Sequence, residues 1–352
     1  MTSGASNSIG DYTLLDRLAD HGQMGPLYRA RDERTGRTVA LRIVRDEISG
    51  WRRDKLLASA ALAKKVSHPH VASLYDIGEA EGKLYLVHEF VPGESLRTWL
   101  HGRPLEQHMV VGLGIHIADG LAEAERVGLA HRDIQPGTVM VTPRDQAKLI
   151  DLGFATWTSG GAARRRVSAE LSVGQEWWED QFPGAQNRPP SYMSPEEALG
   201  HRLDVRSDIF SLGIVLYQMA TGQVPFAGAT DAGTALKIVQ ATPTPPSRLN
   251  PAIAPELDAV ISKMLVKSLD GRYQHAADVA AALRRVAADI EMRALEDGPP
   301  SRDTRDARRF GGQPSPASQP ELREKRAFSA GWWKVAVFVL VVLVALAYFV
   351  LY

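Results

Sequence analysis

The sequence predicts an α+β fold in which a part rich in short strands precedes a mainly helical part. Strand-like runs lie at 12–18, 38–44, 71–78 and 83–90. One helix-like stretch, 51–66, interrupts them, and from residue 96 onward apolar side chains recur at helical spacing, most clearly over 106–127. The chain closes with a third feature, an uninterrupted run of apolar and aromatic residues at 335–352.

Length and composition narrow the class of protein. The chain has 352 residues, which suits one domain of about 250–300 residues plus an appendage. Lysine and arginine together equal aspartate and glutamate, so no overall basic charge indicates a nucleic-acid partner. The absence of cysteine excludes a disulfide framework and any cysteine-based metal or nucleophile site.

The C-terminal segment predicts a membrane anchor. Residues 332–352 are long and apolar enough for one transmembrane helix, which needs about 20 residues, although a buried core helix is the alternative. Four basic residues, Arg323, Lys325, Arg326 and Lys334, precede the apolar run at 335–352. The positive-inside tendency therefore predicts a single-pass, tail-anchored protein of the inner (cytoplasmic) membrane, with its soluble part in the cytoplasm. Residues 291–331 read as a flexible juxtamembrane linker and residues 1–10 as a disordered N-terminus without a signal peptide.

Two loops carry the strongest functional signal. One contains His131-Arg132-Asp133 before a strand-like run at 139–141, and the other begins at Asp151 after a run at 147–149. They resemble the catalytic loop (H-R-D-x-x-x-x-N) and the metal-binding loop (D-F-G) of protein kinases. The resemblance extends over about residues 11–288 and is closest to the eukaryotic-like serine/threonine protein kinases of bacteria.

This resemblance implies a two-lobed protein-kinase-like fold over residues 11–290, with a small β-rich first lobe and a helical second lobe. It implies ATP and Mg²⁺ as cofactors, a protein as substrate or partner, and no nucleic acid. Asp133 takes the position of the catalytic base, and Asp151 and Thr138 take those of the metal ligands. The nucleotide-binding positions fall on Gly22, Gly25, Arg42, Glu89, Val91 and Met140.

Several positions that carry chemistry in the family depart from its pattern. The departures are Arg42 for the strand lysine, Ser59 for its glutamate partner, Gln135 for the catalytic-loop lysine, Thr138 for asparagine, Pro189 for threonine and Asp20 for the first loop glycine. The residues that support the fold in the family are retained. Asp208 is expected to brace the catalytic loop, and Arg272 to pair with Glu196.

Three functions remain open on this basis. The first is a membrane-anchored pseudokinase that acts by partner binding with weak or no phosphotransfer. The second is an active serine/threonine kinase that transfers the ATP γ-phosphate to protein hydroxyls, and the third is a tail-anchored adaptor that binds no nucleotide. In the long segment after Asp151, Ser168 reads as a phosphosite or part of a solvated loop, and Trp177-Trp178 as a contact with the domain or with a partner.

Overall fold

A computed structural model describes residues 8–19, 25–44, 50–154 and 190–296. The chain divides after Gly298, and all of these residues belong to the first of its two units. Predictions for Asp20, Gly22, Ser168, Trp177, Trp178 and Pro189, and for segments 1–7 and 297–352, lie outside the described residues.

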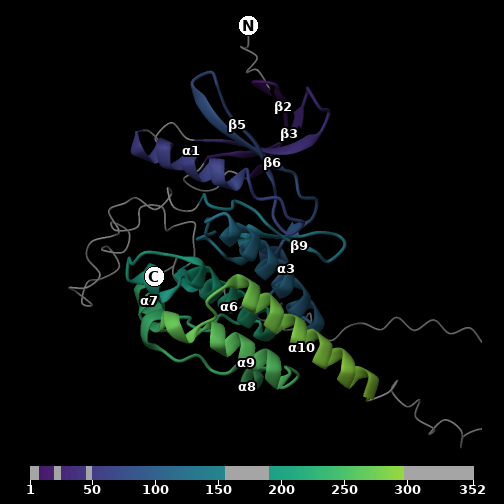
Figure 1. Ribbon diagram of the computed structural model, residues 1–352, viewed down its shortest axis with the longest axis vertical. Helices are drawn as coiled ribbons and strands as arrows, with labels where there is room; N and C mark the ends of the chain where they lie inside the picture. Colours follow the sequence, from purple (N-terminus) through teal and green to yellow (C-terminus); the bar gives the residue numbers. More distant parts are fainter. Residues whose placement is uncertain (1–7, 20–24, 45–49, 155–189, 297–352) are drawn as a thin grey trace, which may run out of the picture. The chain divides into compact units, whose positions relative to one another are not determined.

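The first lobe is an antiparallel sheet with one helix beside it (Figure 1). Its strands are β1 (Ser8–Ile9), β2 (Tyr12–Ala19), β3 (Leu27–Asp32), β4 (Thr38–Ile43), β5 (Leu74–Ala80) and β6 (Lys83–Glu89), in the order β1-β2-β3-β4-β6-β5. Glu81 and Gly82, which join β5 to β6, both have positive φ, as a tight hairpin turn requires. Helix α1 spans Trp51–Ala63.

Helix α1 is shorter than the predicted 51–66 stretch. The amides of Lys65 and Val66 donate to carbonyls three residues back, at Leu62 and Ala63, so the last turn is tightened and leaves the α-helical pattern. Pro69 follows closely and cannot donate a backbone hydrogen bond. The helix therefore ends before the apolar spacing in the sequence does.

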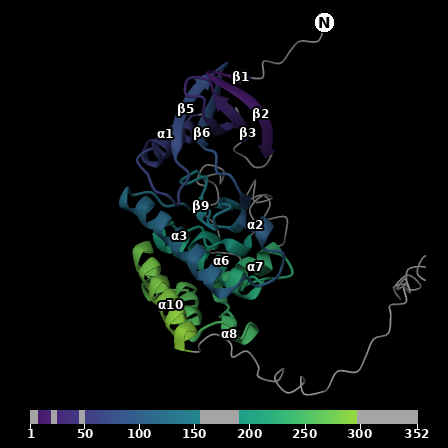
Figure 2. The ribbon, with the colours of Figure 1, turned by 90° about the vertical axis from the view of Figure 1, so that its right-hand side faces the viewer.

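The second lobe is mainly helical and holds a small sheet on its side facing the first lobe (Figures 1 and 2). The sheet consists of β7 (Glu94–Ser95), β8 (Val139–Val141) and β9 (Ala147–Leu149). The helices are α2 (Leu96–Trp99), α3 (Gln107–Arg126), α5 (Pro195–Ala198), α6 (Val205–Thr221), α7 (Asp231–Gln240), α8 (Pro246–Leu249), α9 (Pro255–Met264) and α10 (Ala276–Glu296). Short 3₁₀ helices lie at η1 (Pro136–Thr138), η4 (Pro190–Tyr192) and η5 (Leu269–Gly271).

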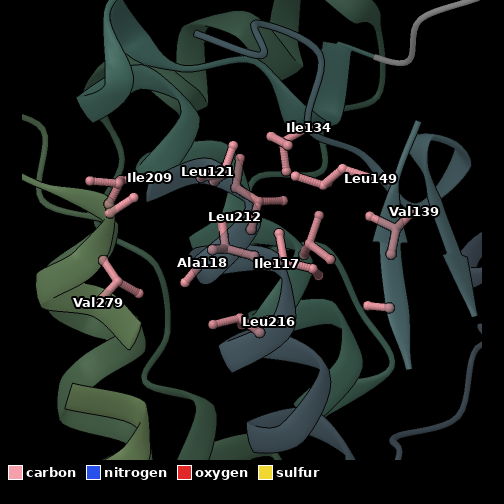
Figure 3. Close-up of a cluster of buried hydrophobic side chains, with 14 of the residues drawn as sticks. Ile117, Ala118, Leu121, Ile134, Val139, Leu149, Ile209, Leu212, Leu216 and Val279 are labelled. Atoms are coloured by element: carbon pink, nitrogen blue, oxygen red, sulfur yellow. The ribbon is translucent and has the colours of Figure 1, made fainter. Parts of the chain in front are cut away.

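The core of this lobe forms where α3, α6 and the small sheet meet (Figure 3). Ile117 and Leu121 of α3 pack with Leu212 of α6, and all three side chains are fully buried. Burying a leucine or isoleucine contributes about 1.5–3 kcal/mol. This packing fixes the position of β8 and β9, whose ends carry the two loops with the kinase-like motifs.

The described residues match the predicted two-lobed kinase fold. None of their helices is long and apolar enough to cross a membrane. The predicted transmembrane segment, 332–352, is not among them.

Two stacked histidines, His70 and His116, contact strand β9 of the small sheet. The rings of His70 and His116 lie 4.1 Å apart, and both contact the backbone of Ala147: its carbonyl lies 2.9 Å from His70 Nδ1, and its amide donates to His116 Nδ1 at 3.3 Å. Burial, followed by the proximity of His70, lowers the pKa of His116 to about 4, and burial also lowers the pKa of His70. Both rings are therefore neutral near pH 7.

The histidine pair predicts a loss of stability in mild acid. Because the folded pKa values lie below the ordinary 6.5, the unfolded chain binds protons first, and the stabilisation is lost as the pH falls from about 6.5 toward 4. We expect a loss of about 1–2 kcal/mol between pH 7 and 5 for half-buried rings. His116→Asn keeps an acceptor for Ala147 but does not titrate, so urea unfolding should show a smaller loss, whereas exposed His108→Asn should match the wild type. Equal pH profiles for all three proteins would contradict the prediction.

Candidate active site

The loop that carries Asp133 is held from below by helix α6. The two carboxylate oxygens of buried Asp208 accept the backbone N–H groups of His131 and Arg132, each at 2.7 Å. Arg132 has φ of 66°, a left-handed conformation that these bonds stabilise. The His131 ring lies 3.0 Å from the carbonyl of Ile150, which ties this loop to the one that begins at Asp151. The predicted bracing role of Asp208 is confirmed.

Within this loop, side chains form hydrogen bonds with one another and with the loop backbone. Gln135 Nε2 donates to Asp133 Oδ1 at 2.8 Å, so the carboxylate at the base position contacts a neutral amide. The Thr138 hydroxyl donates toward the backbone carbonyls of Asp133 at 2.6 Å and Gln135 at 3.1 Å. It accepts the backbone N–H of Gln135 at 3.2 Å. The hydroxyl predicted as a metal ligand is thus directed into its own loop.

Arg42 and Asp151 form a partly buried ion pair between the lobes, in which the side chain of Arg42 is 7% exposed and that of Asp151 25%. Arg42 Nη2 lies 2.9 and 3.0 Å from the two carboxylate oxygens of Asp151, and Nη1 donates to the carbonyl of Gly25 at 3.3 Å. Burial tends to raise the pKa of Asp151, but the charge and hydrogen bonds of Arg42, with His88 and His131, hold it below its ordinary value. The carboxylate predicted to bind metal is therefore ionised and already paired with a cation.

The missing acid on α1 explains this pairing. Ser59, at the position where the family has glutamate, is half-buried on α1 and offers no charge to Arg42. With no acid at position 59, the carboxylate that Arg42 contacts in the described part of the chain is that of Asp151. The contact is made through Nη2 alone, while Nη1 donates to the carbonyl of Gly25.

Three other residues predicted to bind the nucleotide lie at the end of β6, just after it and on β8: Glu89, Val91 and Met140. Val91 is buried after β6, and among the described residues no hydrogen bond is found for its N–H, which leaves that donor available. The Glu89 side chain accepts from Lys148 Nζ at 2.5 Å and from the Ser73 amide at 3.3 Å. Met140, half-buried on β8, pairs in register with Lys148. The Lys148–Glu89 pair was not predicted, because its partners are 59 residues apart in sequence.

His88 lies deep in the same region. Its ring is buried against Phe154, with the centroids 5.5 Å apart, and among the described residues its Nε2 has no hydrogen-bond partner. Burial lowers the pKa of His88 to about 4, so the ring is neutral. Phe154 is a contact that the motif at Asp151 did not reveal.

The residues at the predicted metal positions do not fit Mg²⁺ as they stand. Mg²⁺ requires oxygen ligands free to coordinate it, preferably carboxylates. Asp151 is engaged by a guanidinium and Thr138 by its own loop. Among the described residues no group of three or more His, Cys, Asp or Glu side chains could hold a metal ion.

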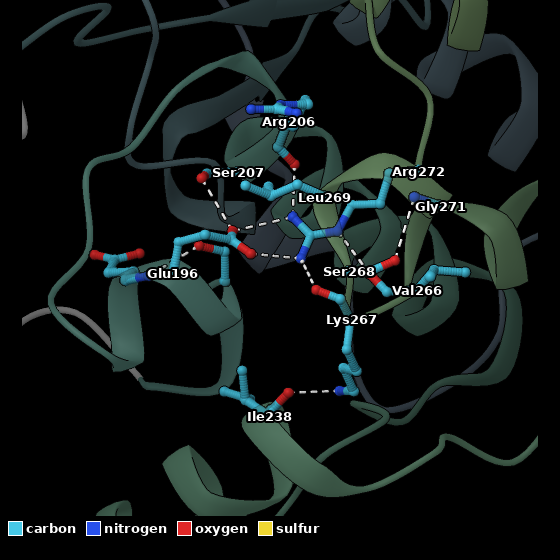
Figure 4. Close-up of polar contacts among 12 residues, drawn as sticks. Glu196, Arg206, Ser207, Ile238, Val266, Lys267, Ser268, Leu269, Gly271 and Arg272 are labelled. Carbon is cyan, nitrogen blue, oxygen red and sulfur yellow. Dashed lines mark hydrogen bonds and ion pairs between the residues drawn. The ribbon is translucent and has the colours of Figure 1, made fainter. Parts of the chain in front are cut away.

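A second buried ion pair supports the helical lobe (Figure 4). Arg272 donates to both oxygens of Glu196, from Nη2 at 2.6 Å and Nη1 at 3.0 Å, and the arginine side chain is fully buried. Ser207 donates to the same carboxylate at 3.1 Å, and Lys267 lies beside it with its ammonium bound to the carbonyl of Ile238. The predicted pairing of Arg272 with Glu196 is confirmed.

Comparison with known proteins gives one consistent result. The protein kinase domain family matches residues 17–282. The serine/threonine-protein kinase PknB of Mycolicibacterium smegmatis is 32% identical over 357 residues, covering 95% of this chain and 54% of the relative. A probable serine/threonine-protein kinase of Streptomyces coelicolor is 33% identical over 303 residues, covering 83% of this chain and 41% of that protein. The chain thus spans about half the length of these relatives.

Among solved structures, the kinase domain of Mycobacterium tuberculosis PknI has the same fold. The TM-score is 0.60 at 22% identity, with 82% of this chain and 100% of that domain covered. The fold and the two loops define a protein kinase domain. This chain belongs to the protein kinase family, among the eukaryotic-like serine/threonine kinases of bacteria. That family in general uses ATP and Mg²⁺ and acts on proteins.

Proposed function

We propose that this protein is a membrane-anchored, kinase-like signalling protein that acts by binding a protein partner, with phosphotransfer weak or lost. The observation that carries the proposal is the ion pair of Arg42 and Asp151. Hydrogen bonds between a guanidinium and an ionised carboxylate are shorter and stronger than those between neutral groups, and Arg42 Nη2 reaches both oxygens of Asp151. Mg²⁺ would have to compete with this guanidinium for the oxygens of Asp151.

The catalytic loop supports the same conclusion. Gln135 is neutral where the family places a lysine that steadies the transferring phosphate, so one positive charge is missing beside Asp133. Thr138 uses its hydroxyl for its own loop. In mutated enzymes the loss of a single stabilising contact of this kind costs about 2–4 kcal/mol in the transition state, and here several such contacts are changed.

An active serine/threonine kinase is the second candidate, and one observation favours it. Asp208 holds the backbone of the Asp133 loop by two short hydrogen bonds, so the scaffold of the catalytic loop is intact. Phosphoryl transfer depends mainly on positioning and charge. The N–H of Val91, which makes no hydrogen bond to another described residue, fits an acceptor on a bound nucleotide. ATP binding therefore belongs to both candidates, with its strength reduced in the first.

Membrane anchoring is proposed from sequence alone. The apolar run at 335–352 follows basic residues and would place residues 11–290, the kinase-like domain, on the cytoplasmic side through the linker at 291–331. Cell fractionation should find the full chain in the membrane, and a chain ending at residue 331 in the soluble fraction. Equal distribution of the two would remove this part of the proposal.

Phosphate transfer tests the proposal directly. With radiolabelled ATP, Mg²⁺ and a generic protein acceptor such as casein, the full chain should transfer no more label than Asp133→Asn. Transfer by the wild-type chain that Asp133→Asn abolishes would establish the active kinase instead.

A further inference from the structure

An arginine outside the two motif loops reaches the base position through one intervening side chain. Arg97, exposed on α2, donates from Nη2 to Gln135 Oε1 at 2.6 Å. Gln135 in turn donates to Asp133 Oδ1 at 2.8 Å. The guanidinium, the amide and the carboxylate therefore form a chain of contacts whose outer end is exposed.

Gly137 of the loop lies directly against this guanidinium. A Cβ at Gly137 would lie 2.8 Å from Nη2 and 3.1 Å from Cζ of Arg97, closer than side-chain carbons normally approach. A larger residue at 137 would therefore make the flexible end of Arg97 shift from its place beside Gln135.

In the described part of the chain, no carboxylate balances the charge of Arg97. Its partner there is the neutral amide oxygen of Gln135, and it takes part in no ion pair. A guanidinium has five N–H donors, so most of those on Arg97 remain available for a ligand. Planar two-point contact with a carboxylate or a phosphoryl group is the interaction this side chain favours.

We propose that Arg97 binds an anionic side chain, a carboxylate or a phosphoryl group, of the protein segment that lies over Asp133. The inference rests on the proposed function, in which a partner segment occupies the place of a kinase substrate. The inference adds the chemical class of that segment. One of the residues that flank the residue over Asp133 is acidic or phosphorylated. Arg97 binds the anionic residue of the segment, Gln135 connects Arg97 to Asp133, and Gly137 lies against the guanidinium.

Peptide binding to the full chain tests this assignment. The probes are fluorescent serine-centred peptides with an alanine background, in which each flanking position carries glutamate, phosphoserine, glutamine or lysine in turn. Fluorescence anisotropy should show that an anionic residue at one flanking position strengthens binding about tenfold over glutamine, which corresponds to about 1.4 kcal/mol. The glutamate and phosphoserine arms distinguish the two sources of negative charge.

Two variants address Arg97 by different routes. Arg97→Gln removes the charge, and Gly137→Ala keeps the charge but displaces the flexible end of Arg97. Arg97→Gln should abolish the tenfold preference, Gly137→Ala should reduce it, and Arg97→Glu should shift it toward lysine peptides. Arg126→Ala, which removes an exposed arginine at the end of α3, is the matched control and should keep the preference.

The outcomes separate this inference from the proposed function. A preference for anionic peptides that survives Arg97→Gln, binding without such a preference, or no binding of any peptide at millimolar concentration would each overturn the role of Arg97. An Arg97→Gln variant that loses ATP affinity but keeps its peptide preference would also overturn it, because the guanidinium would then serve the nucleotide. If the wild-type chain phosphorylates the peptides, the pseudokinase proposal fails, but the same comparison of acidic and neutral peptides still decides the role of Arg97.

Discussion

Arg272→Ala is expected to lower the free energy of unfolding by about 3–5 kcal/mol, because it leaves the buried carboxylate of Glu196 without its cation. The substitution also removes donors from the carbonyls of Val266, Lys267 and Arg206, which Arg272 now satisfies. Urea unfolding followed by circular dichroism measures the change.

Arg284→Ala provides the control for this prediction. Arg284 pairs with Asp119 on the surface between α10 and α3, and its side chain is 54% exposed. Exposed pairs contribute about 0–1 kcal/mol, so this variant should remain close to the wild type. Similar losses for both variants would show that the buried pair with Glu196 is not a main support of the helical lobe.

The second large effect is expected at Arg42. Arg42→Lys removes the nitrogen bound to Gly25 and replaces Nη2, which contacts both oxygens of Asp151, by the ammonium of a shorter side chain. The contact with Asp151 is thereby weakened, which favours Mg²⁺ binding. Adding Ser59→Glu on α1 offers the ammonium an alternative carboxylate. We expect Mg²⁺ to strengthen ATP binding about tenfold in the double variant, which corresponds to a further rise in melting temperature of about 3–5 °C at saturating ATP.

Arg53→Lys is the matched control, since Arg53 pairs with Glu79 at the surface of the same lobe. It should show no response to Mg²⁺. If the double variant also shows none, the pairing of Arg42 with Asp151 is not what keeps the metal out.

The sequence predicted the supports of the site better than its chemistry. Asp208 and the pair of Glu196 with Arg272 belong to long motifs, and each motif specifies both the residue and its partner. The contact of Arg42 with Asp151 joins residues 109 positions apart and arises because Ser59 offers no charge, so no local pattern contains it.

The directions of side chains could not be predicted from the sequence either. Thr138 matches the position of a metal ligand, yet its hydroxyl is used by the carbonyls of its own loop, which depends on backbone geometry that spacing does not give. Arg97 lies on the short helix α2, which belongs to none of the motifs. Its contact with Gly137 is visible only in the structure. Helix and strand ends shifted by one to a few residues because capping and tight turns, rather than apolar spacing, end an element.

If Arg42 holds Asp151 in place of a metal ion, ATP binding should not depend on Mg²⁺. The melting temperature of the full wild-type chain should be measured with millimolar ATP, first in EDTA and then in Mg²⁺, with Asp151→Asn beside it. We expect Mg²⁺ to add no stabilisation to that given by ATP alone in either protein. A rise of several degrees that requires Mg²⁺ and is lost in Asp151→Asn would contradict it, because Asp151 would then bind the metal despite Arg42.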